Sequence, residues 1–282
     1  MKQILACIDG SRSASSVCDY AAWAAVRLQA PLTLLHVLDP HRYPRETDLS
    51  GNLELGAREH LLQELAELDA RRNRLALEQG QHMLDAACER VRAHGIDNPV
   101  QRQRHGLLAE AAVELEADTG LLVMGKAGES HADELAMGDN VEQVIRALHC
   151  PILLAAGEFR PPQHVMLAFD NRESSRAGVQ LLADSPLFRD LRCHLVTVSD
   201  RADDLKGDLS RARQTLEQSG HRVDVAVLTG DIEPALHEYQ HSHQVDMVVM
   251  GAYGHSRLRE WLLGSTTNDM IRHARVPHLL LR

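Results

Sequence analysis

The 282-residue sequence has no long apolar run, few cysteines and no excess of positive charge. No apolar stretch reaches the roughly 18 residues that a membrane-spanning helix needs, and the start, MKQILACIDGS, becomes polar too soon for a secretory signal. The five cysteines are odd in number and unclustered, which suits reduced thiols. A formal net charge of −10 argues against a nucleic-acid backbone as the main partner. These absences predict a cytoplasmic protein that neither crosses a membrane nor binds nucleic acid.

The sequence does contain a long internal repeat, between residues 121–154 and residues 247–280. Each copy has an apolar run ending in Met-Gly, a Gly-x2-Gly pair, a third glycine after nine more residues, and a proline-led apolar run. The matching positions lie 126 residues apart: Gly125, Gly128, Gly138 and Pro151 correspond to Gly251, Gly254, Gly264 and Pro277. One constant spacing over four such residues predicts a duplicated chain.

The repeat also covers the start of each half, because residues 4–9 match residues 165–170 at a constant spacing of 161. Pro161 and Pro162 mark a boundary, since proline interrupts both helices and strand ladders. We therefore expect two domains, residues 1–157 and 163–282, each large enough to bury a core.

Apolar runs alternate with stretches of helical spacing in each half. In the first half the expected strands lie near residues 3–8, 32–38, 99–104, 121–124 and 151–155. This alternation is typical of the α/β class, with a doubly wound parallel sheet of five strands in each half. Ligands of such sheets bind beyond the carboxyl ends of the strands, where the winding reverses. The glycine-rich loops fall at these ends.

The glycine-rich loop of the second half has the chemistry of a phosphate site. Gly251 and Gly254 remove side chains where the chain leaves a strand, so backbone N–H groups can approach a ligand. Gly264-Ser265-Thr266 then opens a helix, whose free N–H groups and dipole attract an anion. The structural alternative is that Gly264 forms a turn and Ser265 caps the helix.

Three charged or polar side chains accompany this loop, each with two interpretations. Asp170 ends the first strand of the second half, where it could contact a base or ribose, or cap the next helix. His255 and Arg257 could reach phosphate or ribose, or remain solvated loop residues.

The strand-end aspartate and the Gly-x2-Gly-x9-Gly-Ser/Thr stretch together resemble the universal stress protein (UspA-like) family, over both halves. The resemblance implies two tandem Rossmann-like domains of the adenine nucleotide alpha hydrolase-like type, packed as a pseudo-dimer. It also implies that ATP, or a related adenine nucleotide with Mg²⁺, binds the second half. The contacts it implies are with the base (Asp170, Val198), the ribose (Met250, Gly251) and the phosphates (Gly254, Gly264, Ser265, Thr266).

The first half departs from this pattern. Its weaker candidates, at the matching positions, are Asp9, Val37, Gly125, Gly128 and Gly138. However, its loop reads Gly138-Asp139-Asn140 where the resemblance calls for serine or threonine. A carboxylate there would repel phosphate by about 1 kcal/mol or more, or would cap its own helix. We expect the first half to bind ATP weakly or not at all.

Two other motifs suggest enzymes that the rest of the sequence does not support. Residues 237–241 spell H-E-x-x-H, a zinc-protease motif, but they occupy an ordinary crossover helix, and no obvious third ligand follows, although His243 is close. Residues 120–127 nearly spell a Walker loop but lack the Ser/Thr that holds magnesium. We therefore predict neither a metal site nor a catalytic residue.

The first half carries an insertion at residues 41–94. Residues 41–56 are polar and predict a loop, and residues 57–94 predict a long helix interrupted near Gly80. We favour a helix packed on its own sheet over one that covers a pocket or contacts a partner.

These observations predict a stress-response regulator that binds an adenine nucleotide in its second half and signals to a protein partner. No evident general base is present, so rapid ATP hydrolysis is not expected; slow hydrolysis or self-phosphorylation at Ser265 or Thr266 rests on the resemblance alone. The alternative is an interaction scaffold whose glycine loops are only structural. An adenylating enzyme is disfavoured because neither an SGGxDS loop nor a HIGH-type motif is present. Further dimerisation of the tandem chain stays open.

Overall fold

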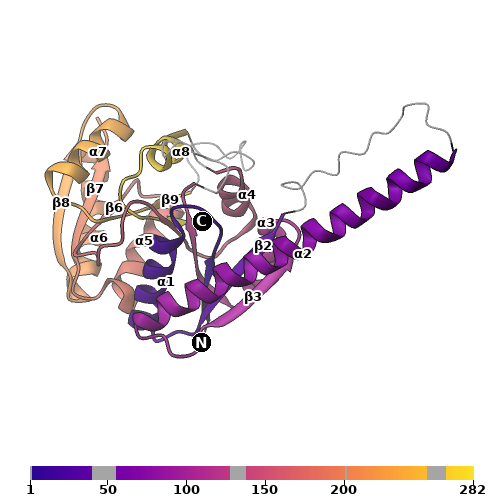
Figure 1. Ribbon diagram of the computed structural model, residues 1–282. Helices are drawn as coiled ribbons and strands as arrows, with labels where there is room; N and C mark the ends of the chain where they lie inside the picture. Colours follow the sequence, from indigo (N-terminus) through magenta and orange to yellow (C-terminus); the bar gives the residue numbers. More distant parts are fainter. Residues whose placement is uncertain (1, 40–54, 128–137, 201, 253–264) are drawn as a thin grey trace.

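The computed structural model describes residues 2–39, 55–127, 138–200, 202–252 and 265–282 (Figure 1). Within these ranges the side chains of residues 55–62, 139, 202–204 and 265 are not described. The predicted loop at residues 41–56 therefore lies almost wholly outside the described residues.

Strands and helices alternate along both halves, as the sequence predicts. The strands are β1 (Gln3–Cys7), β2 (Leu32–Leu38), β3 (Val100–His105), β4 (Thr119–Gly125), β5 (Ile152–Ala155), β6 (His164–Ala168), β7 (Arg192–Val198), β8 (Arg222–Leu228), β9 (Met247–Gly251) and β10 (His278–Leu281). The helices are α1 (Ala14–Leu28), α2 (Leu55–Ala93), α3 (Leu108–Leu115), α4 (Asp139–Ala147), α5 (Glu173–Asp184), α6 (Ala202–Gln218), α7 (Ile232–Ser242) and α8 (Ser265–Arg272), with short 3₁₀ turns η2 (Glu116–Asp118) and η3 (Pro186–Phe188). None of the helices in these ranges is both long and apolar enough to span a membrane.

All ten strands form one continuous sheet, in the order β3-β2-β1-β4-β5-β10-β9-β6-β7-β8. Neighbouring strands are parallel within each half, and β5 pairs with β10 antiparallel, with Leu153 opposite Leu279. Because of this antiparallel pair, the carboxyl ends of the two sets of strands lie at opposite edges of the sheet. The winding reverses between β1 and β4, and again between β6 and β9. Those two places are where this architecture puts ligands.

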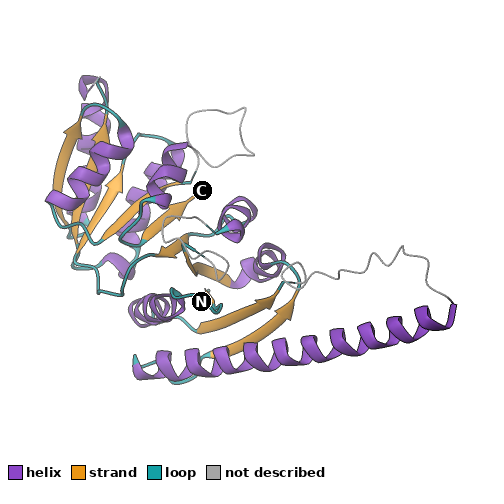
Figure 2. Cartoon of the chain, turned by 45° about the horizontal axis from the view of Figure 1, so that its top comes forward, coloured by secondary structure: helices purple, strands orange, loops and turns teal. Residues whose placement is uncertain are grey.

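Helices cover both faces of the sheet (Figure 2). Helices α1, α2, α5 and α6 pack on one face and α3, α4, α7 and α8 on the other, each set through its own apolar cluster. Successive strand residues face opposite clusters, as with Ile4 and Leu5 in β1. Each cluster contains residues from both halves, so the core is continuous across the β5–β10 pair.

The insertion forms a single helix, α2, of 39 residues. The predicted interruption near Gly80 is wrong, because α2 passes through this residue without a break. A Cβ atom at position 80 would lie 2.1 Å from the Nε2 atom of Gln103 and 2.6 Å from the Cδ2 atom of His36. The glycine therefore lets the helix lie directly on β2 and β3.

The two ends of α2 have different surroundings. Its C-terminal part packs on the sheet through the buried Leu84, and Arg90 donates two hydrogen bonds, of 2.6 and 2.7 Å, to the buried carboxylate of Asp19 on α1. Its N-terminal part extends well away from the sheet, with Leu68 and Leu75 about half exposed (Figure 1). The expectation of a helix packed on its own sheet is thus correct only for the C-terminal part.

The two halves also cap each other's helices across the seam. The buried Lys126, just after β4, donates to the carbonyl oxygens of Arg272 (2.9 Å) and Ala274 (3.3 Å) at the end of α8. Arg282, just after β10, donates to the carbonyl oxygens of Arg146 (2.7 Å) and Leu148 (3.3 Å) at the end of α4. Cations are favourable there because the final carbonyl groups of a helix have no partner within it.

Candidate functional site

The candidate site of the second half lies at its switch point, where β6 and β9 are neighbours. Asp170 follows the end of β6, and Gly251 is the last residue of β9. Helix α8 begins at Ser265, so its first N–H groups lie beyond the same strand ends. The fold thus brings these three sequence-predicted positions to one edge of the sheet.

The carboxylate of Asp170 does not cap the following helix, whose N-cap is Arg172. Its Oδ1 atom accepts a hydrogen bond of 3.0 Å from the Arg172 N–H, and its Oδ2 atom lies 3.3 Å from Arg172 Nε. An aspartate that bonds the amide two residues ahead forms an Asx turn, which holds the loop after β6. The side chain is still 50 % exposed, so the carboxylate remains open to a ligand.

The residues expected near the base and ribose differ in what they can offer. Val198 is half-buried at the end of β7. Met250 is 5 % exposed and its side chain packs in the core. Because that side chain points inward, only the backbone of Met250 could face a ribose. Gly251 carries no side chain and is partly exposed.

Thr267 is a residue of the candidate site that the sequence interpretation missed. Its buried hydroxyl donates a 3.1 Å hydrogen bond to the carbonyl oxygen of Gly251. This bond ties the first turn of α8 to the end of β9, while the neighbouring Thr266 is partly exposed. The hydroxyl two residues after Ser265 was the available signal, because such residues favour helix starts.

Several predicted residues lie outside the described part of the chain: Gly128, Gly254, His255, Arg257 and Gly264. Ser265 is described only as the first residue of α8. Likewise, Asp139 begins α4, whose N-cap is Gly138, but its side chain is not described. The roles expected for these side chains stay predictions.

In the first half, hydrogen bonds join the loop after β1 to the residues just after β4. The carboxylate of Asp9 accepts the N–H of Ser11 (3.1 Å), and Ser11 Oγ lies 2.8 Å from Ser13 Oγ. Ser13 in turn donates to the carbonyl oxygen of Ala127 (3.3 Å), beyond β4. A Cβ atom at Gly125 would lie 2.2 Å from Ser13 Oγ. The glycine thus accommodates a serine of its own chain.

The remaining first-half candidates also make internal contacts. The N–H of Gly138 donates to the carbonyl oxygen of Lys126 (3.0 Å). This N–H is therefore already bonded within its own loop. Val37 is half-buried near the end of β2. The first half therefore matches the second in topology, and its described loop residues bond to one another.

A sequence profile described as the Universal stress protein family matches residues 1–155 and 202–282. The chain belongs to the universal stress protein family. Universal stress protein Slr1230 of Synechocystis is 33 % identical over 287 residues, covering 100 % of both chains. Universal stress protein Rv2624c of Mycobacterium tuberculosis is 21 % identical over 100 % of this chain and 97 % of its own.

Solved structures agree on the fold of this universal stress protein. A universal stress protein from Archaeoglobus fulgidus superposes with a TM-score of 0.73 at 18 % identity, covering 99 % of this chain and 98 % of its own. A putative universal stress protein from Pseudomonas aeruginosa gives a TM-score of 0.63 at 16 % identity, covering 100 % and 93 %. Both similarities span the full tandem arrangement.

Four of the five thiols of this universal stress protein are not poised as nucleophiles. Burial raises the pKa of Cys7, Cys18 and Cys193 to about 12, and that of Cys150 to about 11. A nucleophilic cysteine needs a lowered pKa, because the thiolate is the reactive form. These four cysteines are therefore not expected to react as thiolates near neutral pH.

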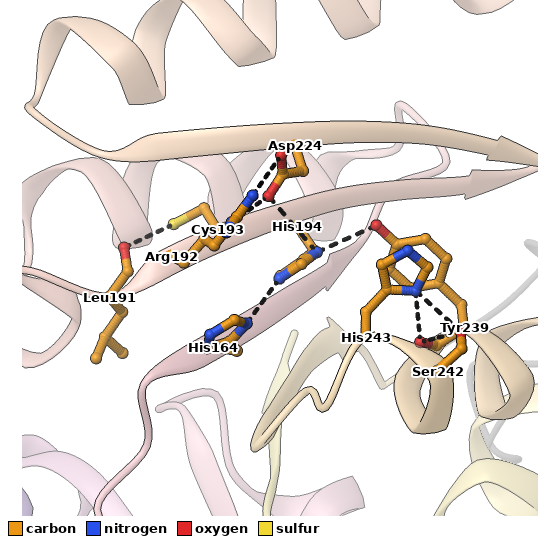
Figure 3. A network of polar contacts seen from close by, with 9 residues as sticks. All are labelled: His164, Leu191, Arg192, Cys193, His194, Asp224, Tyr239, Ser242 and His243. Atoms are coloured by element: carbon orange, nitrogen blue, oxygen red, sulfur yellow. Dashed lines mark hydrogen bonds and ion pairs between the residues drawn. The ribbon is translucent and has the colours of Figure 1, made fainter.

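A second polar cluster lies at the other edge of the second half, at the amino ends of β6 and β7 (Figure 3). His164 Nδ1 lies 3.1 Å from His194 Nε2, and His194 Nδ1 lies 3.1 Å from the Tyr239 hydroxyl. The His243 ring stacks on the Tyr239 ring. Burial lowers the pKa of His194 to about 4, so its ring is neutral at pH 7. This cluster is distant along the strands from the switch-point edge and serves the packing of α7.

Proposed function

We propose that this universal stress protein binds an adenine nucleotide, with ATP as the first choice, at the switch point of its second half. The observation that carries the proposal is the start of α8 beside the end of β9, held there by the Thr267–Gly251 hydrogen bond. Free N–H groups at a helix start attract phosphate. The exposed carboxylate of Asp170, just beyond the end of the neighbouring strand β6, can accept hydrogen bonds from a base or ribose.

The donor set of the second half fits such a ligand. A nucleotide presents anionic phosphates at one end and hydrogen-bond donors at the other, and this edge offers N–H donors at α8 and a carboxylate after β6. Mg²⁺ would accompany the phosphates. In the first half, by contrast, Asp139 and Asn140 stand at the positions of Ser265 and Thr266, so a carboxylate would meet the phosphates. We therefore propose that one nucleotide binds per chain.

We further propose that the chain divides into domains at residues 1–157 and 163–282, and that it acts in the cytoplasm as a nucleotide-responsive regulator of a protein partner. Strand β5 ends at Ala155 and β6 begins at His164, which supports the proposed boundary.

Isothermal titration of the full chain with ATP and Mg²⁺ tests the nucleotide proposal. Ser265→Asp/Thr266→Asn imports the first-half residues into the second-half loop, and Asp139→Ser/Asn140→Thr makes the reverse exchange as a matched control. We expect one ATP site per chain. The first variant should weaken its affinity about 100-fold, because a carboxylate replaces a hydroxyl that donates a hydrogen bond to phosphate. The control should leave the affinity unchanged.

Two further outcomes would count against the proposal. Two equal sites per chain would show that the first half is competent. No heat from the unmutated chain, once mass spectrometry has excluded copurified nucleotide, would favour the interaction scaffold.

A further inference from the structure

Three side chains that no part of the proposed function uses converge between α7 and α8. Glu233 and His237 come from α7, and His273 directly follows α8. The Oε1 atom of Glu233 lies 3.4 Å from His237 Nε2 and 3.1 Å from His273 Nδ1. All three ligand atoms lie within 4.8 Å of one another.

The sequence and the packing together explain this convergence. Glu233 and His237 are four residues apart on α7, so they share one face of the helix. The His273 N–H donates to the Asp269 carbonyl oxygen, which continues the last turn of α8. This bond fixes the backbone position from which the His273 side chain extends. The two imidazole rings meet at 79°, with centroids 6.2 Å apart, so they approach one point from different directions.

Two of the three spacings between the ligand atoms match those of atoms that share one metal ion. Ligands bound at about 2.1 Å to a tetrahedral Zn²⁺ are roughly 3.4 Å apart, close to the two distances from Glu233. In addition, His237 Nε2 is buried and has no hydrogen-bond partner among the described residues. A buried ring nitrogen without a partner is costly, and a metal ion would satisfy it.

We propose that Glu233, His237 and His273 bind a divalent transition-metal ion, with Zn²⁺ as the first choice. Two imidazoles and one carboxylate are ligands that Zn²⁺ favours, and three protein ligands leave a fourth position for water. The site goes beyond the nucleotide proposal and does not depend on it. It clamps α7 to α8 at the end of α8 opposite the helix start where the phosphates would bind.

This set is not the one that the H-E-x-x-H motif would supply. Of that motif only His237 takes part, while Glu238 and His241 are exposed and lie outside the cluster. The ligands Glu233 and His273 come from before and well after the motif. The geometry therefore points to a structural clamp, not to the base-assisted chemistry of a zinc protease.

The test uses the full chain, purified without a histidine tag and stripped with a chelator. Titration with ZnCl₂ should give one site per chain. His273→Gln should weaken that site about 100-fold, since one of three protein ligands is lost. His241→Gln is the matched control, because it removes the other end of the motif, and should bind Zn²⁺ as the unmutated chain does.

A second readout is independent of heat. Saturating Zn²⁺ should raise the Tm of the unmutated chain and of the His241→Gln variant by several degrees, but not that of the His273→Gln variant. The His273 side chain is 55 % exposed, so its replacement should leave the circular dichroism spectrum unchanged.

Three results would overturn the proposal. The first is no saturable Zn²⁺ binding by the unmutated chain, which would mean that Glu233 forms ion pairs with the histidines. The second is equal Zn²⁺ affinity in the His273→Gln variant. The third is loss of binding in the His241→Gln variant, which would assign the ion to another set of ligands.

Discussion

The two halves of the chain share one strand order but meet the same structural needs with different residues. At the seam, the carbonyl oxygens of Arg146 and Leu148 correspond, 126 positions on, to those of Arg272 and Ala274. Both pairs accept hydrogen bonds from a cation of the other half, yet the cation is Arg282 in one case and Lys126 in the other. After duplication, both helix ends are still capped by a cation, as the helix dipole favours. The cation follows β4 in one case and β10 in the other.

A second matched pair differs in chemistry. In the first half, Thr33 Oγ1 donates a 2.6 Å hydrogen bond to Gln3 Oε1, between β2 and β1. At the positions 161 residues later the second half has His194 and His164, whose ring nitrogens lie 3.1 Å apart. Both pairs link neighbouring strands, but only the second contains a side chain, His194, whose pKa burial lowers to about 4. The second half therefore carries a pH dependence that the first half lacks at this place.

The largest effect is expected from moving the first-half pair into the second half. Burial holds the folded-state pKa of His194 at about 4, below its ordinary value of 6.5. Between those values the unfolded chain binds the extra proton, so the free energy of unfolding falls as the pH falls from 6.5 to 4. The loss should total roughly 3 kcal/mol. His164→Gln/His194→Thr should remove most of it.

Urea unfolding at pH 7 and pH 5 measures this slope. The variant should lose about 2 kcal/mol less stability than the unmutated chain between these pH values. His105→Gln, at an exposed position, is the control and should keep the original slope. If the free energy of unfolding changed equally with pH in all three proteins, His194 would not be the source of this pH dependence.

A smaller effect is expected from the capping cations. Lys126→Met removes two hydrogen bonds from a buried ammonium group and should lower the free energy of unfolding by about 2 kcal/mol. Arg282→Met removes the equivalent contacts at an exposed position, where water replaces them, and should cost less than about 1 kcal/mol. Urea unfolding at pH 7 compares them. Equal losses would mean that burial does not decide the strength of the cap.

The smallest effect on stability is expected at one glycine in α2 and one in α6, the equivalent helices of the two halves. The sign of the effect should differ between them. Gly80→Ala in α2 forces a Cβ atom against Gln103 and His36, and should destabilise by about 1 kcal/mol or more. Gly207→Ala in α6 meets no atom within 4 Å, so it should stabilise by about 0.5–1 kcal/mol through higher helix propensity. Thermal unfolding reads the sign directly. A rise in Tm for both variants would refute the close packing of α2.

Much of the fold was predictable from the sequence. The strand expected at residues 32–38 is observed at Leu32–Leu38, and the strand expected at 99–104 is observed at Val100–His105. Apolar runs and the repeat carry this information locally. The break expected near Gly80 was wrong because a glycine in a helix weakens propensity and permits close packing alike, and only the neighbouring strands decide between the two.

The sites were less predictable, since they depend on contacts between distant residues. The sequence contrast between the two glycine loops is local, but the hydrogen bond of Ser13 in the first half is made with Ala127, 114 residues away. The cluster of Glu233, His237 and His273 likewise depends on how α7 packs against α8. Of the H-E-x-x-H motif, only His237 belongs to this cluster.

The antiparallel pairing of β5 with β10 has a consequence for concentration. In a dimer of separate chains, such a pair would dissociate on dilution. Here both strands belong to one polypeptide, and a short tether of this kind gives an effective local concentration on the order of millimolar. The two halves should therefore stay paired at any cellular abundance. Either half expressed alone would expose an apolar edge strand, and edge strands of that kind recruit other chains.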